Sequence, residues 1–190
     1  MSLEVVQYGH PALRQKGVRI EKITPEIKKL IADMFQTMYA AKGVGLAAQQ
    51  VGRPLQLTVL DVRGVTDRPS TLEREGKASE PASFMPLVLI NPEVKPLGEP
   101  EAATEGCLSF PEIFAQIKRP GKAEVRALNE KGEPVEFRCG GLLARAIQHE
   151  MDHLNGVLFI DRMTRADKDE LKSQLDEMQA RTKAALKAKK

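Results

Sequence analysis

The chain has 190 residues, of which 42% are hydrophobic, so it is long enough to bury the core of one globular domain. Its 29 Lys and Arg against 26 Asp and Glu give a net charge of +3, but the last ten residues, RTKAALKAKK, hold five of those bases and no acid. The other 180 residues carry 24 bases and 26 acids, which argues against a general nucleic-acid-binding protein and confines any anionic partner to the basic end.

The N-terminal third of the chain predicts one helix. In TPEIKKLIADMFQTMYAAKG, Thr24 is a typical N-cap, Pro25 suits the first helical position, and Gly43 ends the helix. The apolar residues of this segment recur at helical spacing, which predicts one buried face made of Ile27, Leu30, Ile31, Met34, Phe35 and Met38.

After this helix the sequence predicts a loop, a strand and a second loop. Residues 43–52, GVGLAAQQVG, are rich in small residues, so we expect a close-packed loop. Residues 55–62, LQLTVLDV, alternate as in a strand with two different faces. Residues 64–83 are polar and interrupted by Pro and Gly, which predicts a long exposed loop.

The second half of the chain predicts three strands and two helices. Residues 87–91, LVLIN, indicate a short buried strand, and residues 123–139 indicate two strands around an NEKG turn. Helical spacing follows over residues 140–156, whose closing Asn-Gly pair favours a left-handed stop. From Ala166 we expect a charged amphipathic helix that runs into the basic end at 181–190 and buries Leu171, Leu175 and Met178.

This order of elements predicts the fold class. Strands in the middle, with helices before and after them, favour an α+β fold. We expect antiparallel β-sheets packed around the central helix of residues 140–156, with an N-terminal helix and a C-terminal amphipathic helix.

Cysteine usage bears on the compartment. Cys107 and Cys139 are the two cysteines, too few for a disulfide framework, and the sequence shows neither the apolar core of a signal peptide nor a transmembrane run. We therefore expect a reducing, cytoplasmic location and no membrane partner, in which a cysteine is at least as suited to metal binding or catalysis as to a single disulfide.

The segment QHEMDH places two histidines on one helical face. Residues four apart on a helix point the same way, so His149 and His153 can direct their rings at one divalent metal. Glu150 is rotated by roughly 100° from His149 and would flank the metal, where a carboxylate can act as a proton shuttle. The H-E-x-x-H pattern thus predicts a catalytic metal site, and the competing interpretation is an exposed helix with two incidental histidines.

A catalytic metal site usually has three protein ligands, and the third is open at this point. The metzincin pattern fails because Phe159 stands where its last histidine should be, while Glu170 and Glu177 stay possible on the C-terminal helix. Cys107 follows a glycine and can expose a thiolate, and Cys139 lies ten residues before the first histidine. Both cysteines together would make a closed structural zinc site, although they lack the usual close pairing.

Three stretches together resemble the motifs of one family. GVGLAAQQ (43–50), EGCLSFP (105–111) and QHEMDH (148–153) occur in the order found in peptide deformylases. YGHPALRQKG near the start and HLNGVLFIDRM after the helix are also similar. By this likeness residues 1–163 would form the catalytic domain, and residues 164–190 a C-terminal helix with a basic end that belongs to the same unit.

The resemblance implies a reaction and a metal. The reaction is hydrolysis of the N-formyl group from the initiator methionine of newly synthesised polypeptides, with release of formate. The implied metal ligands are Cys107, His149 and His153, and the implied metal is Fe²⁺, which Zn²⁺, Ni²⁺ or Co²⁺ can replace. In this interpretation Glu150 moves the proton from water to the departing amine.

The resemblance also implies how substrate is held. Gln50 and the backbone N–H of Leu108 would donate hydrogen bonds to the carbonyl oxygen as it becomes an oxyanion. The backbone of Gly45 would contact the peptide, and the methionine side chain would lie in an apolar pocket made by Val44, Leu142 and Ala146.

The resemblance also implies a macromolecular partner. Family members use a C-terminal helix at the ribosome, so we expect the basic end at 181–190 to serve the same contact through phosphate attraction. His10 is expected to be structural.

Two departures from the family pattern concern peptide recognition: residues 64–83 are longer than in compact members, and Phe114 replaces a basic residue of some relatives. The rival interpretations are a metallopeptidase that cuts internal peptide bonds and a non-enzymatic zinc module.

Overall fold

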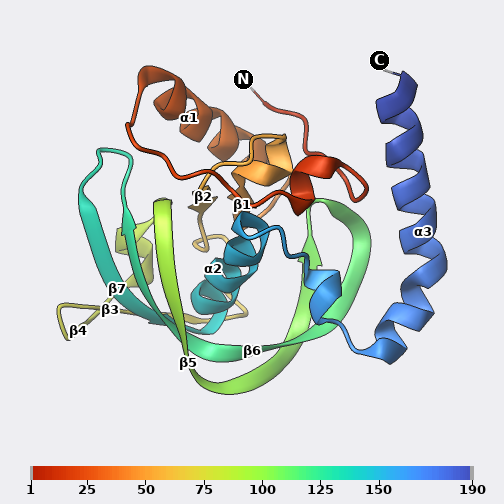
Figure 1. Ribbon diagram of the computed structural model, residues 1–190. Coiled ribbons are helices and arrows are strands. Elements are labelled where there is room, and N and C mark those ends of the chain that lie inside the picture. The colour runs from red at the N-terminus through yellow and green to blue at the C-terminus, as the bar shows by residue number, and fades with distance from the viewer. Residues whose placement is uncertain (1, 189–190) are drawn as a thin grey trace.

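One bent antiparallel sheet encloses the central helix. The computed structural model describes residues 2–188, and within them the long strands β5 and β6 curve around helix α2 (Figure 1). The strands pair in the order β1-β2-β5-β6-β7-β3-β4, and every pairing in this order is antiparallel. The strands are β1 (Gly45–Ala47), β2 (Leu57–Leu60), β3 (Ser70–Arg74), β4 (Lys77–Ser79), β5 (Leu87–Cys107), β6 (Phe110–Leu128) and β7 (Pro134–Gly140).

The predicted helices are present, and with the sheet they confirm the α+β class. Thr24 caps the first of them, since its hydroxyl accepts a hydrogen bond from the Ile27 N–H. The α-helices are α1 (Pro25–Ala40), α2 (Gly141–Leu154) and α3 (Arg165–Ala188). Short 3-10 helices span Pro11–Arg14, Ala48–Val51, Pro81–Phe84 and Phe159–Arg162. His10 is structural as expected, because its Nδ1 accepts from the Ala12 N–H at the start of the first of these turns.

Helices α1 and α2 cover opposite faces of the sheet around β2. All four residues of β2 are buried, so both of the faces that its alternation predicts pack against protein. Leu57 and Val59 pack with Met34 of α1, whereas Leu60 packs with Ile147 of α2. Both faces of this strand are therefore covered, one by α1 and the other by α2.

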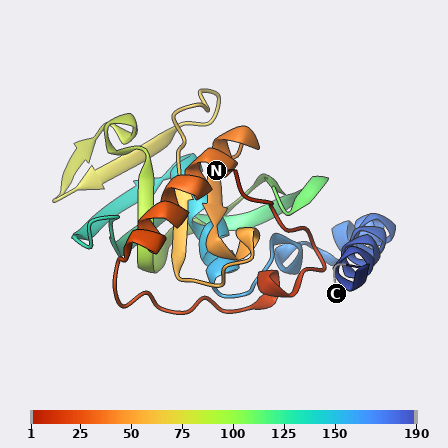
Figure 2. The ribbon, with the colours of Figure 1, turned by 90° about the horizontal axis from the view of Figure 1, so that it is seen from above.

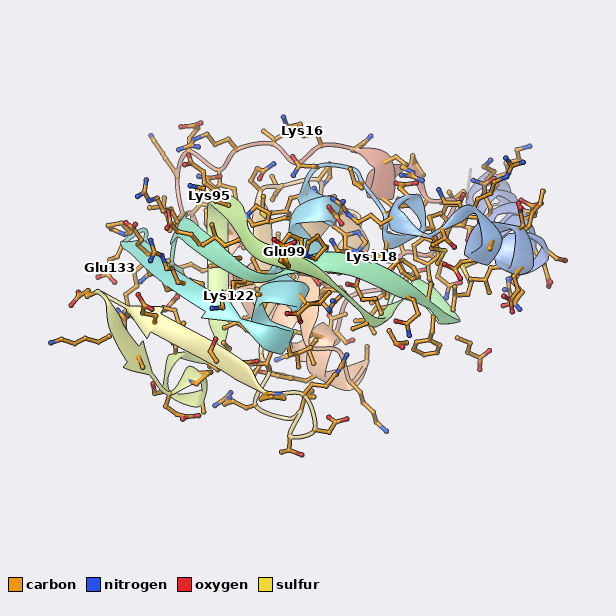
Figure 3. The ribbon with its side chains drawn as sticks, turned by 90° about the horizontal axis from the view of Figure 1, so that it is seen from below. Lys16, Lys95, Glu99, Lys118, Lys122 and Glu133 are labelled. Atoms are coloured by element: carbon orange, nitrogen blue, oxygen red, sulfur yellow. The ribbon has the colours of Figure 1, made fainter. Side chains whose placement is uncertain are left out.

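Strands β5 and β6 are much longer than predicted. The sequence between residues 92 and 106 is polar and contains three prolines and two glycines, which hid the extension of β5. In β6, buried Ile113, Ala115 and Ile117 alternate with exposed residues. The outer face of these strands carries charged side chains, among them Lys95, Glu99, Lys118 and Lys122 (Figure 3).

The small-residue segment 43–52 is ordered structure and not the predicted loop. Gly45–Ala47 form β1, which pairs with β2, and Ala48–Val51 form a 3-10 turn. A strand of three residues is too short to show a period, so its long-range pairing decides its conformation. As an edge strand, β1 brings residues 44–50 beside α2.

Residues 64–83 also depart from the predicted exposed loop. They contain the hairpin of β3 and β4, and β3 pairs with β7. The start of this hairpin caps α2: the Pro69 carbonyl accepts from the Leu142 N–H at 3.2 Å, and the Ser70 hydroxyl accepts from the Leu143 N–H at 3.1 Å. The first turn of α2 thus finds its missing hydrogen-bond partners in a segment that the composition assigned to solvent.

Helix α3 packs along the N-terminal segment at one side of the molecule (Figure 2). Its Leu175 and Met178 are buried in a cluster with Ile113 and Phe159, as the amphipathic pattern predicts, and Leu171 packs against that cluster. Lys189 and Lys190 of the basic end lie outside the described residues. Among the helices within residues 2–188, none has the length and apolar content needed to cross a membrane.

Gly141 offers a test of how α2 is anchored. Its φ is +64°, and a Cβ there would lie 2.1 Å from the Pro69 carbonyl oxygen. We expect Gly141→Ala to lower the free energy of unfolding by about 3 kcal/mol or more, because left-handed strain adds to a backbone clash. Urea unfolding at equilibrium measures this loss.

Gly76→Ala is the matched control. Gly76 has φ +73° but no heavy atom within 4 Å of its ideal Cβ, so only the strain of about 1–2 kcal/mol applies. Equal losses for the two variants would contradict the anchoring role of the Pro69 carbonyl.

Candidate metal centre and active-site cavity

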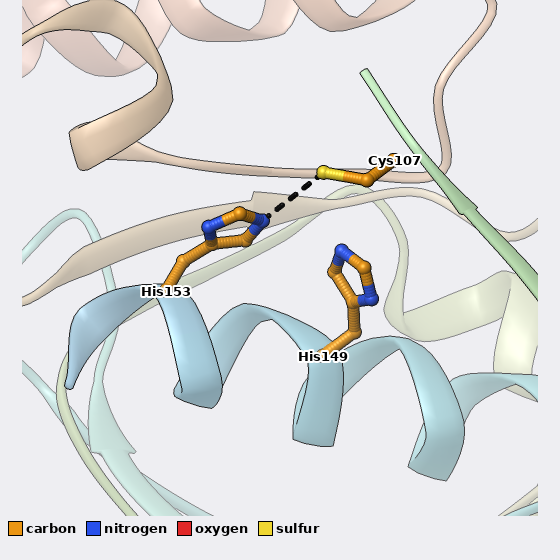
Figure 4. Close-up of side chains that lie close together, drawn as sticks. All are labelled: Cys107, His149 and His153. Carbon is orange, nitrogen blue, oxygen red and sulfur yellow. Dashed lines mark hydrogen bonds between the residues drawn. The ribbon is translucent and has the colours of Figure 1, made fainter. Parts of the chain in front are cut away.

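A thiol and two imidazoles converge beside α2. His149 and His153 lie one turn apart on the same face of this helix, and Cys107 approaches from the end of β5 (Figure 4). The Cys107 Sγ is 3.3 Å from the His153 Nε2 (Figure 4). The three candidate ligand atoms all lie within 4.8 Å of one another, although Cys107 is more than 40 positions before the two histidines in the chain.

The turn between β5 and β6 delivers the sulfur. Cys107 pairs with Phe110 across a two-residue turn, and the Ser109 carbonyl of that turn accepts from the Tyr8 N–H at 2.9 Å. Gln50 holds the turn from the other side: its Nε2 lies 3.4 Å from the Ser109 hydroxyl and 3.5 Å from the Cys107 Sγ.

The three side chains fit a divalent cation. One sulfur and two ring nitrogens are the donors that zinc and other transition metals take, and tetrahedral bonds to them would separate sulfur from nitrogen by roughly 3.5 Å, close to the separation found between Cys107 and His153. Burial, together with the charges of His149 and Arg119, lowers the pKa of His153 well below its usual value. Its ring is therefore neutral and offers a lone pair to a metal.

The other ligands left open by the sequence lie elsewhere. Cys139 is buried in β7 between Ala123 and Leu72, and burial raises the pKa of its thiol to about 12. Glu170 and Glu177 are exposed on α3. The described residues therefore hold no closed site of two cysteines and two histidines, and the metal cluster keeps only three protein donors.

The buried carboxylate of Glu105 orients the ring of His149, a contact that was not predicted from the sequence. The Glu105 Oε2 lies 3.0 Å from the His149 Nδ1, so the opposite ring nitrogen is left for a metal. Arg119 donates to both oxygens of Glu105, at 2.6 and 2.9 Å. Burial opposes the charged carboxylate, but the contacts with His149 and Arg119 outweigh it and lower the pKa of Glu105 to about 2.

The network continues to the end of α2. Arg119 also donates to Asp152 at 2.8 Å, and Asp152 accepts in turn from Arg162, at 2.6 Å for the Nε contact. Arg145 of α2 donates to the Glu105 Oε1 at 2.8 Å, the oxygen that does not contact His149. One signal could have revealed this network: Arg119 occupies a buried phase of the β6 alternation, where an unpaired charge would be costly.

Glu150 is buried beside the metal cluster with one free oxygen. Its Oε2 finds no hydrogen-bond partner among the described residues, and burial raises the pKa of this carboxyl to about 7. Gly45 makes room for it, because a Cβ on that glycine would lie 2.5 Å from the Glu150 Oε1. Gly45 contacts this buried carboxylate, and its contact with the peptide backbone stays a prediction.

These residues line one cavity of about 690 Å³. Its wall includes Cys107, His149 and Glu150, so the cluster is open to a small molecule from this side. The residues expected to hold substrate are on the same wall, namely Val44, Gly45, Gln50, Leu108, Leu142 and Ala146. His153 is buried and is not part of this wall.

Comparison with known proteins identifies the family. A family model described as polypeptide deformylase matches residues 2–169. Peptide deformylase of Opitutus terrae is 43% identical over 189 residues, with 98% of each chain covered. That of Prochlorococcus marinus strain MIT 9312 is 45% identical and covers 92% of this chain and 79% of its own. The chain belongs to the peptide deformylase family.

Solved structures agree with this assignment. A Synechococcus elongatus peptide deformylase in complex with actinonin has a TM-score of 0.77 at 41% identity, covering 93% of this chain and 85% of that one. The Thermotoga maritima enzyme has a TM-score of 0.73 at 40% identity, covering 86% and 99%. Like the other members of this family, the chain is a hydrolase that removes the N-formyl group from newly synthesised polypeptides, and Cys107, His149 and His153 form its candidate metal centre.

Replacement of each cysteine distinguishes the metal ligand from the buried thiol. We expect Cys107→Ser to weaken metal binding by more than about 100-fold, because one of three donors is lost. Cys139→Ser should still bind about one metal per chain. Elemental analysis after anaerobic reconstitution and dialysis measures both, with far-UV circular dichroism to verify folding. Loss of metal in the Cys139 variant alone would reverse the assignment.

Proposed function

We propose that Cys107, His149 and His153 hold Fe²⁺ and that this centre hydrolyses the formyl group of the initiator methionine, releasing formate. The observation that carries the proposal is the meeting of these three donors, two of which line the cavity, beside the unpaired oxygen of Glu150. Zn²⁺, Ni²⁺ or Co²⁺ can replace iron, since the same donors suit all of these ions. When bound, the cation supplies a Lewis acid that polarises the formyl carbonyl and activates water.

Glu150 is the proton carrier in this proposal. Its carboxylate takes a proton from the attacking water through the free Oε2 and passes it to the departing amine nitrogen. A pKa of about 7 suits both steps, because the group then accepts and releases protons with little cost near neutrality.

Gln50 and Leu108 are the proposed donors to the developing oxyanion. The Gln50 Oε1 accepts from the Ala47 N–H at 2.9 Å, which turns its NH₂ group toward Cys107. Leu108 follows Cys107 directly in the turn and lines the cavity, which places this residue beside the same centre. A donor that is held in place before the reaction typically lowers the barrier by about 3–4 kcal/mol.

The pocket side chains account for the methionine. Val44, Leu142 and Ala146 form an apolar part of the cavity wall next to Glu150, where a flexible thioether side chain can pack. Gly45 is the first residue of the edge strand β1. Because it has no side chain, the peptide backbone can approach this edge closely. A formyl group is the smallest acyl group, so a tight centre can exclude larger amides by volume.

The location and the second partner follow from the substrate. Formylated chains arise on ribosomes, so we propose that the enzyme acts in the cytoplasm and meets its substrate there. The exposed Arg181, Lys183 and Lys187 near the end of α3 supply positive charge for contact with ribosomal RNA.

The reaction is tested with protein prepared anaerobically with Fe²⁺. Formate release from formyl-methionyl tripeptide is expected, with no cleavage of an unformylated internal-cleavage substrate. Glu150→Gln should lower kcat by about 10²–10⁴-fold while metal content stays the same. Glu112→Gln, an exposed carboxylate on the same cavity, is the control and should retain activity. Cleavage of the internal bond would favour a general peptidase.

The ribosome contact is tested by removing residues 181–190. The truncated enzyme should bind ribosomes at least about 10-fold more weakly at low salt, since each lost phosphate contact lowers the affinity. Its activity on formyl-methionyl tripeptide is the control for folding. Unchanged sedimentation with ribosomes would refute a role for the basic end.

A further inference from the structure

Residues 42–45, the wall segment, lie between α1 and β1 and at the start of β1, and they touch two other parts of the active site. All four residues of the segment line the cavity. A Cβ on Gly43 would lie 2.8 Å from the Leu108 Cδ1, and a Cβ on Gly45 would lie 2.5 Å from the Glu150 Oε1. Because these contacts are so close, a small shift of the wall segment would reach Leu108 and Glu150 alike.

Backbone hydrogen bonds hold the wall segment at both ends. At its start the Lys42 N–H donates to the Tyr39 carbonyl at 3.0 Å, where α1 ends, and Lys42 has a left-handed φ of +55°. Toward its far end the Val44 carbonyl accepts from the Asp61 N–H at 2.9 Å, next to the pairing of β1 with β2. Tyr39 and Asp61 are therefore the two anchors of the wall segment.

A side-chain contact joins these two anchors to each other. The Tyr39 hydroxyl donates to the Asp61 Oδ2 at 2.8 Å, which closes a ring of hydrogen bonds through the wall segment. The Arg63 Nε donates to the Asp61 Oδ1 at 2.9 Å, and the contact with Arg63 lowers the pKa of this carboxyl. Asp61 is only 8% exposed, so its charged carboxylate is held in place by the partners that donate to it.

We propose that Tyr39 and Asp61 are positioning residues, whose hydrogen bond fixes the wall segment and thereby the apolar pocket to which Val44 contributes. The proposal rests on the proposed function, since it takes this pocket as the place of the methionine side chain. Neither anchor lines the cavity, so any effect on the substrate passes through the wall segment. Val44 packs against the same hydrophobic cluster as Leu142 and Ala146, and a displaced wall would lose its fit to the methionine.

The test compares kcat/KM for formyl-Met-Ala-Ala with that for formyl-Ala-Ala-Ala. Tyr39→Phe removes only the hydroxyl of a side chain that is 48% exposed, so the fold is retained. This variant and Asp61→Ala should each lower the Met-to-Ala ratio by about 5–10-fold, mainly by raising KM for the Met peptide. Adding Tyr39→Phe to Asp61→Ala should lower the ratio no further, since both changes break the same hydrogen bond.

Glu136→Gln is the matched control. It breaks the exposed ion pair with Arg126 between β6 and β7, outside the cavity, and should leave the ratio unchanged. A fall of kcat by the same factor for both peptides, with unchanged KM, would mean only a smaller folded fraction and would overturn the positioning role. Additive effects of the two substitutions would overturn the role of their shared hydrogen bond.

Calorimetric binding of the unformylated product peptides separates this proposal from the proposed function. The affinity for Met-Ala-Ala should fall about 5–10-fold more than that for Ala-Ala-Ala in Tyr39→Phe and in Asp61→Ala. Equal changes for both peptides, or none, would overturn the positioning role. Failure of the unchanged protein to release formate would overturn the proposed function instead, while the binding series still decides on the wall segment.

Discussion

The paired charges of Glu105 and Arg119 are the constraint on which the metal centre depends. They join β5 to β6 and, through His149 and Asp152, join both strands to α2. Two buried charges cost several kcal/mol each in lost hydration, and this cost is offset only when every oxygen and N–H has a partner. The carboxylate that completes this network also fixes the ring of His149, a proposed metal ligand, so folding and the orientation of this ring depend on the same hydrogen bonds.

The helices could be predicted because their signals are local. Thr24 and Pro25 mark the start of α1, and the spacing of Leu142, Leu143 and Ile147 marks α2. The sheet was predicted less well, since β1 is too short for a period and the polar, proline-containing part of β5 resembles a loop. Its long pairing with β6 supplies the stability that its composition does not indicate.

The site was foreseen to the extent that its residues share a motif. The spacing of His149 and His153 predicts two donors on one helical face, but it contains no information on which cysteine meets them. That choice depends on the hairpin of β5 and β6. Cys107, the last residue of β5, contacts His153 of α2, more than 40 residues later in the chain. The resemblance to a family supplied Cys107, whereas Glu105 and Arg119 became visible only with the strand register.

The capping of α2 by Pro69 and Ser70 gives a structural role to residues 64–83, the segment between β2 and β5. Surface insertions usually tolerate shortening, because their backbone can exchange protein contacts for water. Here the amides of Leu142 and Leu143 at the start of α2 would lose their acceptors inside the fold, about two turns before His149. A designer who trims this peripheral hairpin to a minimal size would therefore have to build a substitute cap, or accept a metal-binding helix with a frayed beginning.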